Sequence, residues 1–135
     1  MSDSAKTIAF ALVVMPFYTE DQKTARAKLV GPWFDIQHKI EKGEQVSAPQ
    51  DWFAVVHRGQ VEAGAEQTVL EKLFHTFNQE ELPESYRGPS LSTGHFVWLD
   101  VDGGSYWLCT SMGWHRWTHW GEELLTRDCT ELSHK

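Results

Sequence analysis

The sequence feature that most constrains the fold is the stretch from residue 82 to residue 117. In it, a loop rich in turn-forming residues precedes short aromatic and β-branched runs separated by glycines. Asp102-Gly103-Gly104 separates the run His95–Val101 from the run Ser105–Thr110. A short glycine-rich break between two runs of this kind is a strong signal for a β-hairpin. A second glycine-containing break precedes Trp114–His119. The pattern predicts three antiparallel strands in a meander, each of about five or six residues.

Two runs upstream of this stretch predict further strands. Thr7–Phe17 is β-branched and almost continuously apolar, which is typical of a central strand buried on both faces. Trp52–Arg58 is a shorter run of the same kind, and we expect the chain to leave the strand at Gly59-Gln60. Together with the meander, these runs predict an antiparallel sheet of about five strands.

The clearest helix prediction covers Thr68–Phe77. Thr68 and Glu71 fit a capping box, in which a hydroxyl and a carboxylate satisfy amides at the helix start. Asn78 suits the helix end, because asparagine tolerates the left-handed conformation there. One face of this helix is apolar and must pack on the sheet. That face consists of Val69, Leu70, Leu73, Phe74 and Phe77.

A second helix is expected near the N-terminus, over Thr19–Leu29, where acidic residues follow the threonine and a thin apolar stripe is present. Gly31-Pro32 should end it, because proline lacks the amide that continues a helix. Trp33–Ile40 is then either a short helix or an irregular segment, and Glu41–Gln50 is a polar loop. Trp120–Thr126 is a candidate short terminal helix.

Length and charge limit the class of protein. The 135 residues suit one α+β domain spanning residues 1–135. The formal net charge of -7 opposes general binding to phosphate backbones and favours basic protein partners. Cys109 and Cys129 form no disulfide framework, and we expect two reduced thiols, although a pairing of the two stays open. The apolar N-terminal run is too short for a signal peptide or a membrane span, which predicts a cytoplasmic protein without a membrane partner.

Histidine and cysteine residues raise the question of a metal site. His115 and His119 are four positions apart, which on a helix allows them to share a metal ion. On the predicted strand they lie roughly 13 Å apart, too far for one ion. Adding Cys109, His95 or Cys129 gives no spacing typical of zinc sites. The sequence therefore predicts no metal site and no cofactor.

Nucleophilic side chains give no stronger signal. Ser90 and Ser92 precede His95, but the G-x-S-x-G pattern of a nucleophile elbow is absent, and serines are common in such turns. Cys109 with His115 is no better a pair, because a strand cysteine in an apolar setting is usually an inert packed thiol. We therefore predict no catalytic residue.

Large apolar residues point to both faces of the predicted meander. Strand alternation places Phe96 and Trp98 on one face and Val97 and Leu99 on the other. The helix over residues 68–77 can cover one face. The other must meet the N-terminal segment, another chain or solvent. Burial of both faces within the monomer is the plain interpretation, and an exposed aromatic patch is the alternative, which would mark a partner site.

Three segments of the chain resemble the YodL-like domain family. They are T-V-L-E-K-L-F-H-T-F-N, L-P-E-S-Y-R-G-P-S-L-S-T-G-H-F-V-W-L and Y-W-L-C-T-S-M-G-W, within residues 68–117, with a looser match at Phe53–Gln60. The matching residues are Phe74, Phe77, Asn78, Pro83, Tyr86, Gly88, Ser90, Leu91, Ser92, Cys109, Gly113 and Trp114. The chain departs from the family pattern at His95 and Thr110, where members often carry aspartate.

The resemblance implies a small protein of plasmids, phages or other mobile elements, without an established enzymatic activity. We expect a non-enzymatic accessory or inhibitor protein that binds a host or element protein through an aromatic and acidic surface. The predicted binding residues are Tyr86, Arg87, Trp114, Arg116, Trp117 and Trp120.

Two alternatives stay open. One is a nucleic-acid-binding module that uses the sheet aromatics with Arg58, Arg87 and Arg116. The other is a metal-dependent enzyme built on histidine and cysteine. The sequence also leaves the choice between a monomer and a homodimer undecided.

Overall fold

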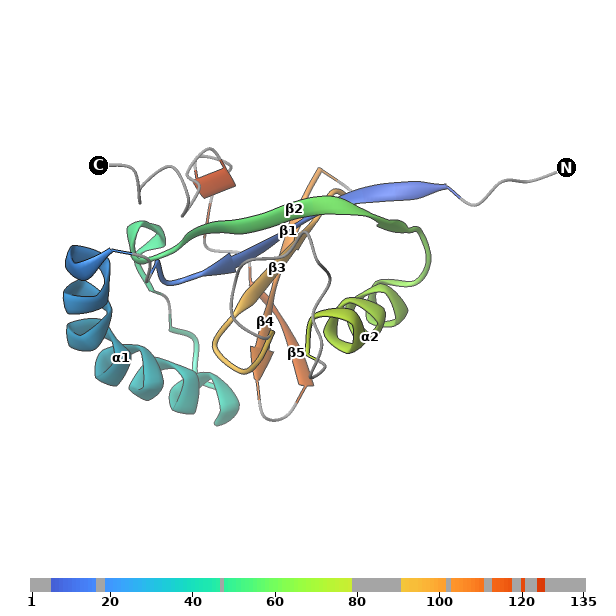
Figure 1. Cartoon of the computed structure of the whole chain (residues 1–135). Coiled ribbons are helices and arrows are strands. Elements are labelled where there is room, and N and C mark those ends of the chain that lie inside the picture. Colours follow the sequence, from blue (N-terminus) through green and yellow to red (C-terminus); the bar gives the residue numbers. More distant parts are fainter. Residues whose placement is uncertain are drawn as a thin grey trace, which may run out of the picture.

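The computed structural model describes residues 6–16, 19–46, 48–78, 91–101, 103–110, 113–117, 120, 124 and 125. They form an α+β fold with a five-stranded antiparallel sheet and two helices, as the sequence predicts (Figure 1). The strands are β1 (Thr7–Val14), β2 (Ala54–Glu62), β3 (Phe96–Leu99), β4 (Ser105–Thr110) and β5 (Gly113–Trp117). The helices are α1 (Glu20–Glu41) and α2 (Glu66–Phe77), and a 3₁₀ turn covers Gln50–Trp52. The strand order is β2-β1-β3-β4-β5.

Strand β1 lies inside the sheet between β2 and β3, which confirms the prediction of a buried inner strand. Strand β2 is longer than predicted, because the expected exit at Gly59 lies within it. A Cβ atom at Gly59 would lie 2.9 Å from Cε1 of Phe10, so the glycine allows the Phe10 ring to lie over the β2 backbone. The register between the two strands shifts between Leu12 and Val13, where β2 carries one extra residue, Val56.

The meander β3–β4–β5 is confirmed. In the β3–β4 pair, Trp98 lies opposite Tyr106. In the β4–β5 pair, Tyr106 lies opposite Trp117. In the β3–β4 turn, Gly103 and Gly104 have φ angles of 86° and 102°. Glycine adopts these left-handed conformations without the steric cost that a Cβ atom imposes. The glycine-rich turn therefore sets the hairpin, as the sequence indicates.

Helix α1 corrects the prediction that Gly31-Pro32 ends the N-terminal helix, because it runs without interruption for 22 residues. Pro32 lies on its exposed side, where water can satisfy the carbonyl that loses its amide partner. Two buried side chains in the second half, Trp33 and Ile40, hold that half against the protein. Tertiary packing thus outweighs the local preference for a helix end.

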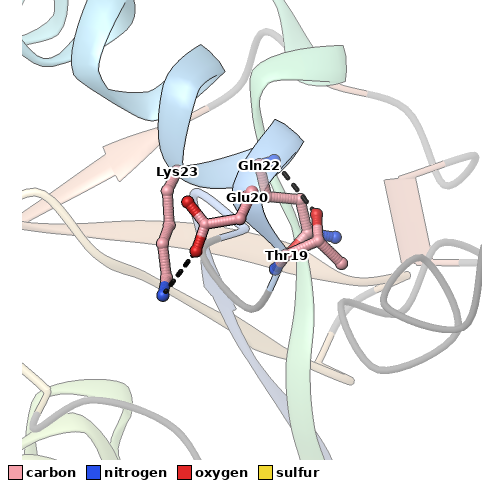
Figure 2. Close-up of polar contacts among 4 residues, drawn as sticks. All are labelled: Thr19, Glu20, Gln22 and Lys23. Carbon is pink, nitrogen blue, oxygen red and sulfur yellow. Dashed lines mark hydrogen bonds and ion pairs between the residues drawn. The ribbon is translucent and has the colours of Figure 1, made fainter.

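The start of α1 has the local contacts that its sequence favours. Thr19 and Gln22 form a reciprocal capping box (Figure 2). The backbone amide of Gln22 donates to Oγ1 of Thr19 at 3.0 Å, and the backbone amide of Thr19 donates to Oε1 of Gln22 at 3.1 Å. Lys23 and Glu20 form a surface ion pair with 3.7 Å between Nζ and Oε1. The cap satisfies amides that have no partner inside the helix, so it fixes where α1 begins.

Helix α2 confirms the predicted helix but not its caps. It begins at Glu66, and its N-cap Ala65 makes no side-chain hydrogen bond, so the capping box predicted at Thr68 is wrong. Asn78 at the C-terminal end has a φ angle of -117°, so the predicted left-handed conformation is also wrong. The side-chain amide of Asn78 instead donates to the carbonyl of Leu91, which ties the helix end to the segment before β3.

Both faces of the sheet are buried, as the plain interpretation of the sequence predicts. Helix α1 covers one face and α2 the other (Figure 1). The α1-side cluster consists of Ala11, Val13, Met15, Trp33, Ile40, Ala48, Phe53, Val55, Phe96, Tyr106, Leu108, Trp117 and Leu124. The α2-side cluster consists of Phe10, Leu12, Val69, Leu70, Leu73, Phe77, Leu91, Val97, Leu99 and Trp107. The predicted terminal helix lies largely outside the described residues.

Candidate binding site

An open hollow of about 440 Å³ lies where α2, the turn before β3, β4 and β5 meet. Its lining residues are Glu71, Phe74, Ser92, Thr93, Cys109, Thr110, Gly113 and Trp114. We call this hollow the α2 pocket. It brings together residues from four segments of the chain, so the fold creates it.

Two aromatic rings contribute to the wall of the α2 pocket. Phe74 comes from α2 and Trp114 from β5, and their ring centroids are 6.4 Å apart with an interplanar angle of 85°. Trp114 lies opposite Cys109 in the β4–β5 register, and residues directly opposite in an antiparallel pair share a face. Phe74 lies on the apolar side of α2, which faces that same face of the sheet. Both rings are half-buried and so remain open to a ligand.

Strand β4 contributes two buried residues, Cys109 and Thr110, to the lining of the pocket. Burial and, secondarily, the nearby Glu71 carboxylate together raise the pKa of the Cys109 thiol to about 11. Cys109 is a free thiol and stays protonated at neutral pH, which makes it a poor nucleophile. The hydroxyl of Thr110 donates to the carbonyl of Gly113 at 2.8 Å, and so helps to fix the start of β5.

The turn before β3 separates the α2 pocket from the α1 side of the sheet. The Ser92 backbone amide donates to Nδ1 of His95 at 3.2 Å, so the imidazole orders this turn. Burial, and secondarily the charge of Arg26, lowers the pKa of His95 to about 4. His95 is therefore neutral at physiological pH. Ser90, the other serine considered from the sequence, lies outside the described residues.

The structure separates the tryptophans that the sequence groups as binding residues. Trp114 lines the α2 pocket. Trp117 is only 2% exposed and packs against Trp33 and Phe96, so this residue has no surface to offer a partner. The reason is strand alternation, which turns Trp117 toward the opposite face from Trp114. Trp120 is half-buried in the α1-side cluster.

The remaining predicted binding residues are placed in part. Arg116 is exposed on β5, with its guanidinium carbon 6.0 Å from the ring centroid of Trp107, its partner in the register. Tyr86 and Arg87 lie outside the described residues. Among the members of the predicted set that the structure describes, Trp114 and Arg116 lie on the same side of the sheet.

Of the eight described residues that line the α2 pocket, sequence reasoning named only Trp114 as a binding residue. It assigned Glu71 to a helix cap and Phe74 to the buried face of α2. The signal for Phe74 was present, since it lies at the margin of the apolar stripe and belongs to the segment that resembles the YodL-like family. Glu71 gave no signal, because its position beside Cys109 depends on how α2 docks on β4.

Two of the arginines considered for nucleic-acid binding, Arg58 and Arg116, are among the described residues, and they lie apart. Arg58 belongs to β2 and Arg116 to β5, which are the two outer strands of the sheet. Four strand spacings separate them, or about 19 Å. The Arg58 guanidinium donates to the carbonyl of Leu125.

The structure describes three of the five histidines and cysteines considered as metal ligands, namely His95, Cys109 and His115. Within the described part of the chain, no three residues among histidine, cysteine, aspartate and glutamate are grouped to hold a metal ion. His115 is exposed on β5, and His119 and Cys129 lie outside the described residues. Within the same part of the chain, no helix combines the length and apolar character needed to cross a membrane.

A second hollow, of about 220 Å³, lies on the α1 side beside His95. Val30 and Phe34 of α1 line it and are 47% and 57% exposed. Thr93 lines both hollows, so the turn before β3 lies between them. This second hollow combines apolar side chains with Arg26 and Gln37.

A family model matches more than half of the chain. The family model described as YodL-like domain matches residues 32–118, which reaches from the second half of α1 through β5. The matched region begins well before the segments in which the sequence resemblance was recognised. No curated protein and no solved structure matches the chain significantly.

Proposed function

The chain belongs to the YodL-like domain family, and from this premise we propose that it is a non-enzymatic binding protein whose α2 pocket receives a side chain of a partner protein. One observation carries the proposal. The residues through which the sequence resembles the family are spread along the chain, yet five of them line this one hollow. They are Phe74, Ser92, Cys109, Gly113 and Trp114.

The chemistry of the α2 pocket favours a cationic side chain. Glu71 is the only charged residue among the described lining residues, and it is exposed. Phe74 and Trp114 add ring faces and edges, and an aromatic face attracts an ammonium or guanidinium group. A lysine or arginine also has an apolar stem that packs along such rings. The net charge of -7 favours a basic partner over an acidic one.

The properties of the polar groups support binding more than catalysis. The Cys109 thiol is protonated because its pKa is raised to about 11. Nδ1 of His95 accepts a backbone amide hydrogen bond, so this nitrogen orients the turn. The hydroxyl of Thr110 donates to a backbone carbonyl. These groups hold the walls of the pocket in place.

The biological setting of the proposal follows from the family resemblance. The protein acts in the cytoplasm as an accessory or inhibitor protein of a plasmid, phage or other mobile element. Its partner is a host protein or a protein of the same element, and the partner presents a lysine or arginine to the α2 pocket.

Affinity capture with matched baits tests the proposal. The wild-type chain, Trp114→Ala, Glu71→Gln and Phe34→Ala are each used to capture proteins from a host lysate, with quantitative mass spectrometry. Phe34→Ala is the control, because it removes an exposed ring on the other side of the sheet. The captured amount of a true partner falls by at least about tenfold with Trp114→Ala and with Glu71→Gln, and is unchanged with Phe34→Ala. A partner lost only with Phe34→Ala contradicts the proposal.

A further inference from the structure

Strand β2 is an outer strand of the sheet. In the part of the chain that the structure describes, β1 is its one neighbour. It is nine residues long, and every other strand of the sheet is shorter. An outer strand of this length presents a row of amides and carbonyls that can pair with another strand.

The hydrogen bonds of β1 show which groups of β2 point outward. The Asp100 amide donates to the Ala9 carbonyl, so the backbone groups of Ala9 face β3. Backbone groups alternate sides along a strand, so those of Phe10 face β2. Gly59 is the register partner of Phe10 and therefore points inward, toward β1.

The same alternation turns the amides and carbonyls of Arg58, Gln60 and Glu62 away from the sheet. A hydrogen bond just beyond the end of β2 agrees with this alternation of inward and outward groups. The amide of Ala63, the residue after Glu62, donates inward to the carbonyl of Lys6. The side chains of the three outward residues are exposed. The outer edge of β2 thus presents a positive, a neutral and a negative side chain at equal spacing.

We propose that this edge pairs with the same edge of a second copy of the chain, antiparallel and centred on Gln60. In this register Arg58 lies opposite Glu62 of the second copy, and Glu62 lies opposite Arg58 of the second copy. Gln60 faces its own counterpart on the twofold axis. Each of the three outward residues exchanges two backbone hydrogen bonds with the residue opposite it in the second copy, and the two sheets join into one.

Charge selects this register over its neighbours. Centring the pair on Arg58 places two guanidinium groups opposite each other, and centring it on Glu62 places two carboxylates opposite each other. Like charges directly opposite destabilise an antiparallel pair, whereas opposite charges stabilise it. Centring on Gln60 forms both attractive pairs and neither repulsive one. An edge that carried one sign of charge would instead resist self-association.

The opposite side of the paired strands is also compatible. There, Gly59 lies opposite Val61 of the second copy, and the half-buried Val61 meets a residue without a side chain. The present contacts of the charged side chains are at the surface. Oε1 of Glu62 lies 3.5 Å from Nζ of Lys72, and the Arg58 guanidinium donates to the carbonyl of Leu125.

Sedimentation velocity and light scattering over a range of protein concentrations test the proposal on the full chain. The wild type should show a concentration-dependent dimer. Gln60→Pro removes an amide that points away from the sheet, so the monomer keeps its fold and the dimer is lost. Arg58→Glu and Glu62→Arg should each weaken the dimer at least about tenfold, because each places like charges opposite. The double variant Arg58→Glu/Glu62→Arg should restore it.

Thermal melts show whether each variant is folded, and the charge variants carry the test if Gln60→Pro does not fold. A wild type that stays monomeric up to several hundred micromolar overturns the proposal. So does a dimer that the folded Gln60→Pro or the single charge variants leave intact, or one that the charge-swapped double variant fails to restore. The readout is mass in solution, so failure here leaves the α2 pocket untouched.

Discussion

The two faces of the sheet are packed by different means. On the α1 side, aromatic rings contact one another edge-on, tilted or, for Trp33 and Phe96, stacked, and two indole N–H groups donate to backbone carbonyls far away in sequence. Trp33 reaches Gly94, 61 positions away, and Trp120 reaches Ala48, 72 positions away. On the α2 side, aliphatic side chains of one amphipathic helix supply much of the packing, and the ring of Phe77 contacts that of Phe10. Directed contacts between distant segments are thus more prominent on the first face, and non-directional burial on the second.

The comparison has a consequence for tolerance to change. A face built from interlocking rings and directed hydrogen bonds leaves few alternative packings, whereas a face built from aliphatic chains can repack. We therefore expect substitutions on the α1 side to cost more stability than matched substitutions on the α2 side. The open pocket also lies on the α2 side, where one helix can adjust to a partner.

The largest expected effect comes from Phe96→Ala on β3. Phe96 is fully buried and packs against Trp33, Phe53 and Trp117, so its loss should lower the free energy of unfolding by about 3–5 kcal/mol. Phe77→Ala, the matched substitution of a buried ring on the other face, should cost about 3 kcal/mol, at the low end of that range. Urea denaturation at pH 7 measures both. Equal costs at the two positions would break the comparison.

Acid should weaken the protein through its buried histidines, and through His95 most. Its folded pKa of about 4 is lower than the unfolded value of 6.5, so its contribution is present above pH 6.5 and lost as the pH falls toward 4. Between pH 7 and 4.5 this amounts to about 2–3 kcal/mol. Urea denaturation at both pH values should show that the free energy of unfolding changes less with pH for His95→Gln than for the wild type.

A second histidine gives the contrast from the other face. Burial against Phe10 and Phe77 lowers the pKa of His57, so it too loses its contribution as the pH falls. Burial is the one cause of this lowered pKa, whereas the charge of Arg26 adds to the effect at His95, so His57→Gln should flatten the pH dependence less. A pH dependence that neither substitution changes would mean that carboxylates dominate it.

The β3–β4 turn offers a smaller test on the α1 side. Both of its described glycines have positive φ angles, but a Cβ atom at Gly104 would lie 2.7 Å from Nε1 of Trp98, whereas one at Gly103 meets nothing within 4 Å. Gly103→Ala should cost about 1 kcal/mol from backbone strain alone. Gly104→Ala should cost about 2–3 kcal/mol, because the indole must also move. Thermal unfolding of the two variants separates these terms.

The smallest effect concerns the thiol in the α2 pocket. In a Cys129→Ser background, Glu71→Gln should lower the pKa of Cys109 and raise its alkylation rate by less than tenfold, because burial is the main cause of the raised pKa. Iodoacetamide labelling between pH 7 and 10, followed by mass spectrometry, measures the rate. A larger increase would show that the carboxylate, and not burial, controls the thiol.

Much of the fold follows from local patterns in the sequence. The glycine-rich turn sets the meander, and the apolar spacing of α2 fixes which side of that helix is buried. Helix α1 could not be predicted in full, because Gly31-Pro32 is a strong local signal for an end and only the burial of Trp33 and Ile40 overrides it. The prediction that the strand ends at Gly59 failed for a similar reason. Gly59 leaves room for the ring of Phe10 on the neighbouring strand, which the local sequence does not show.

The candidate site was less predictable than the fold. Trp114 and Trp117 have opposite parity on one strand, so the sequence alone implies that they face different ways. Which of those faces would be covered depends on where α1 docks, which no local pattern shows. The placement of Glu71 beside Cys109 likewise depends on the docking of α2.

The extra residue in β2 opposite the Leu12–Val13 step changes the phase of side-chain alternation along that strand. Val55 belongs to the α1-side cluster, whereas His57, two positions further on, contacts the rings of Phe10 and Phe77 on the α2 side. In a regular strand, residues two positions apart face the same side. Because of the bulge, one continuous strand can therefore serve two different cores with residues of the same parity.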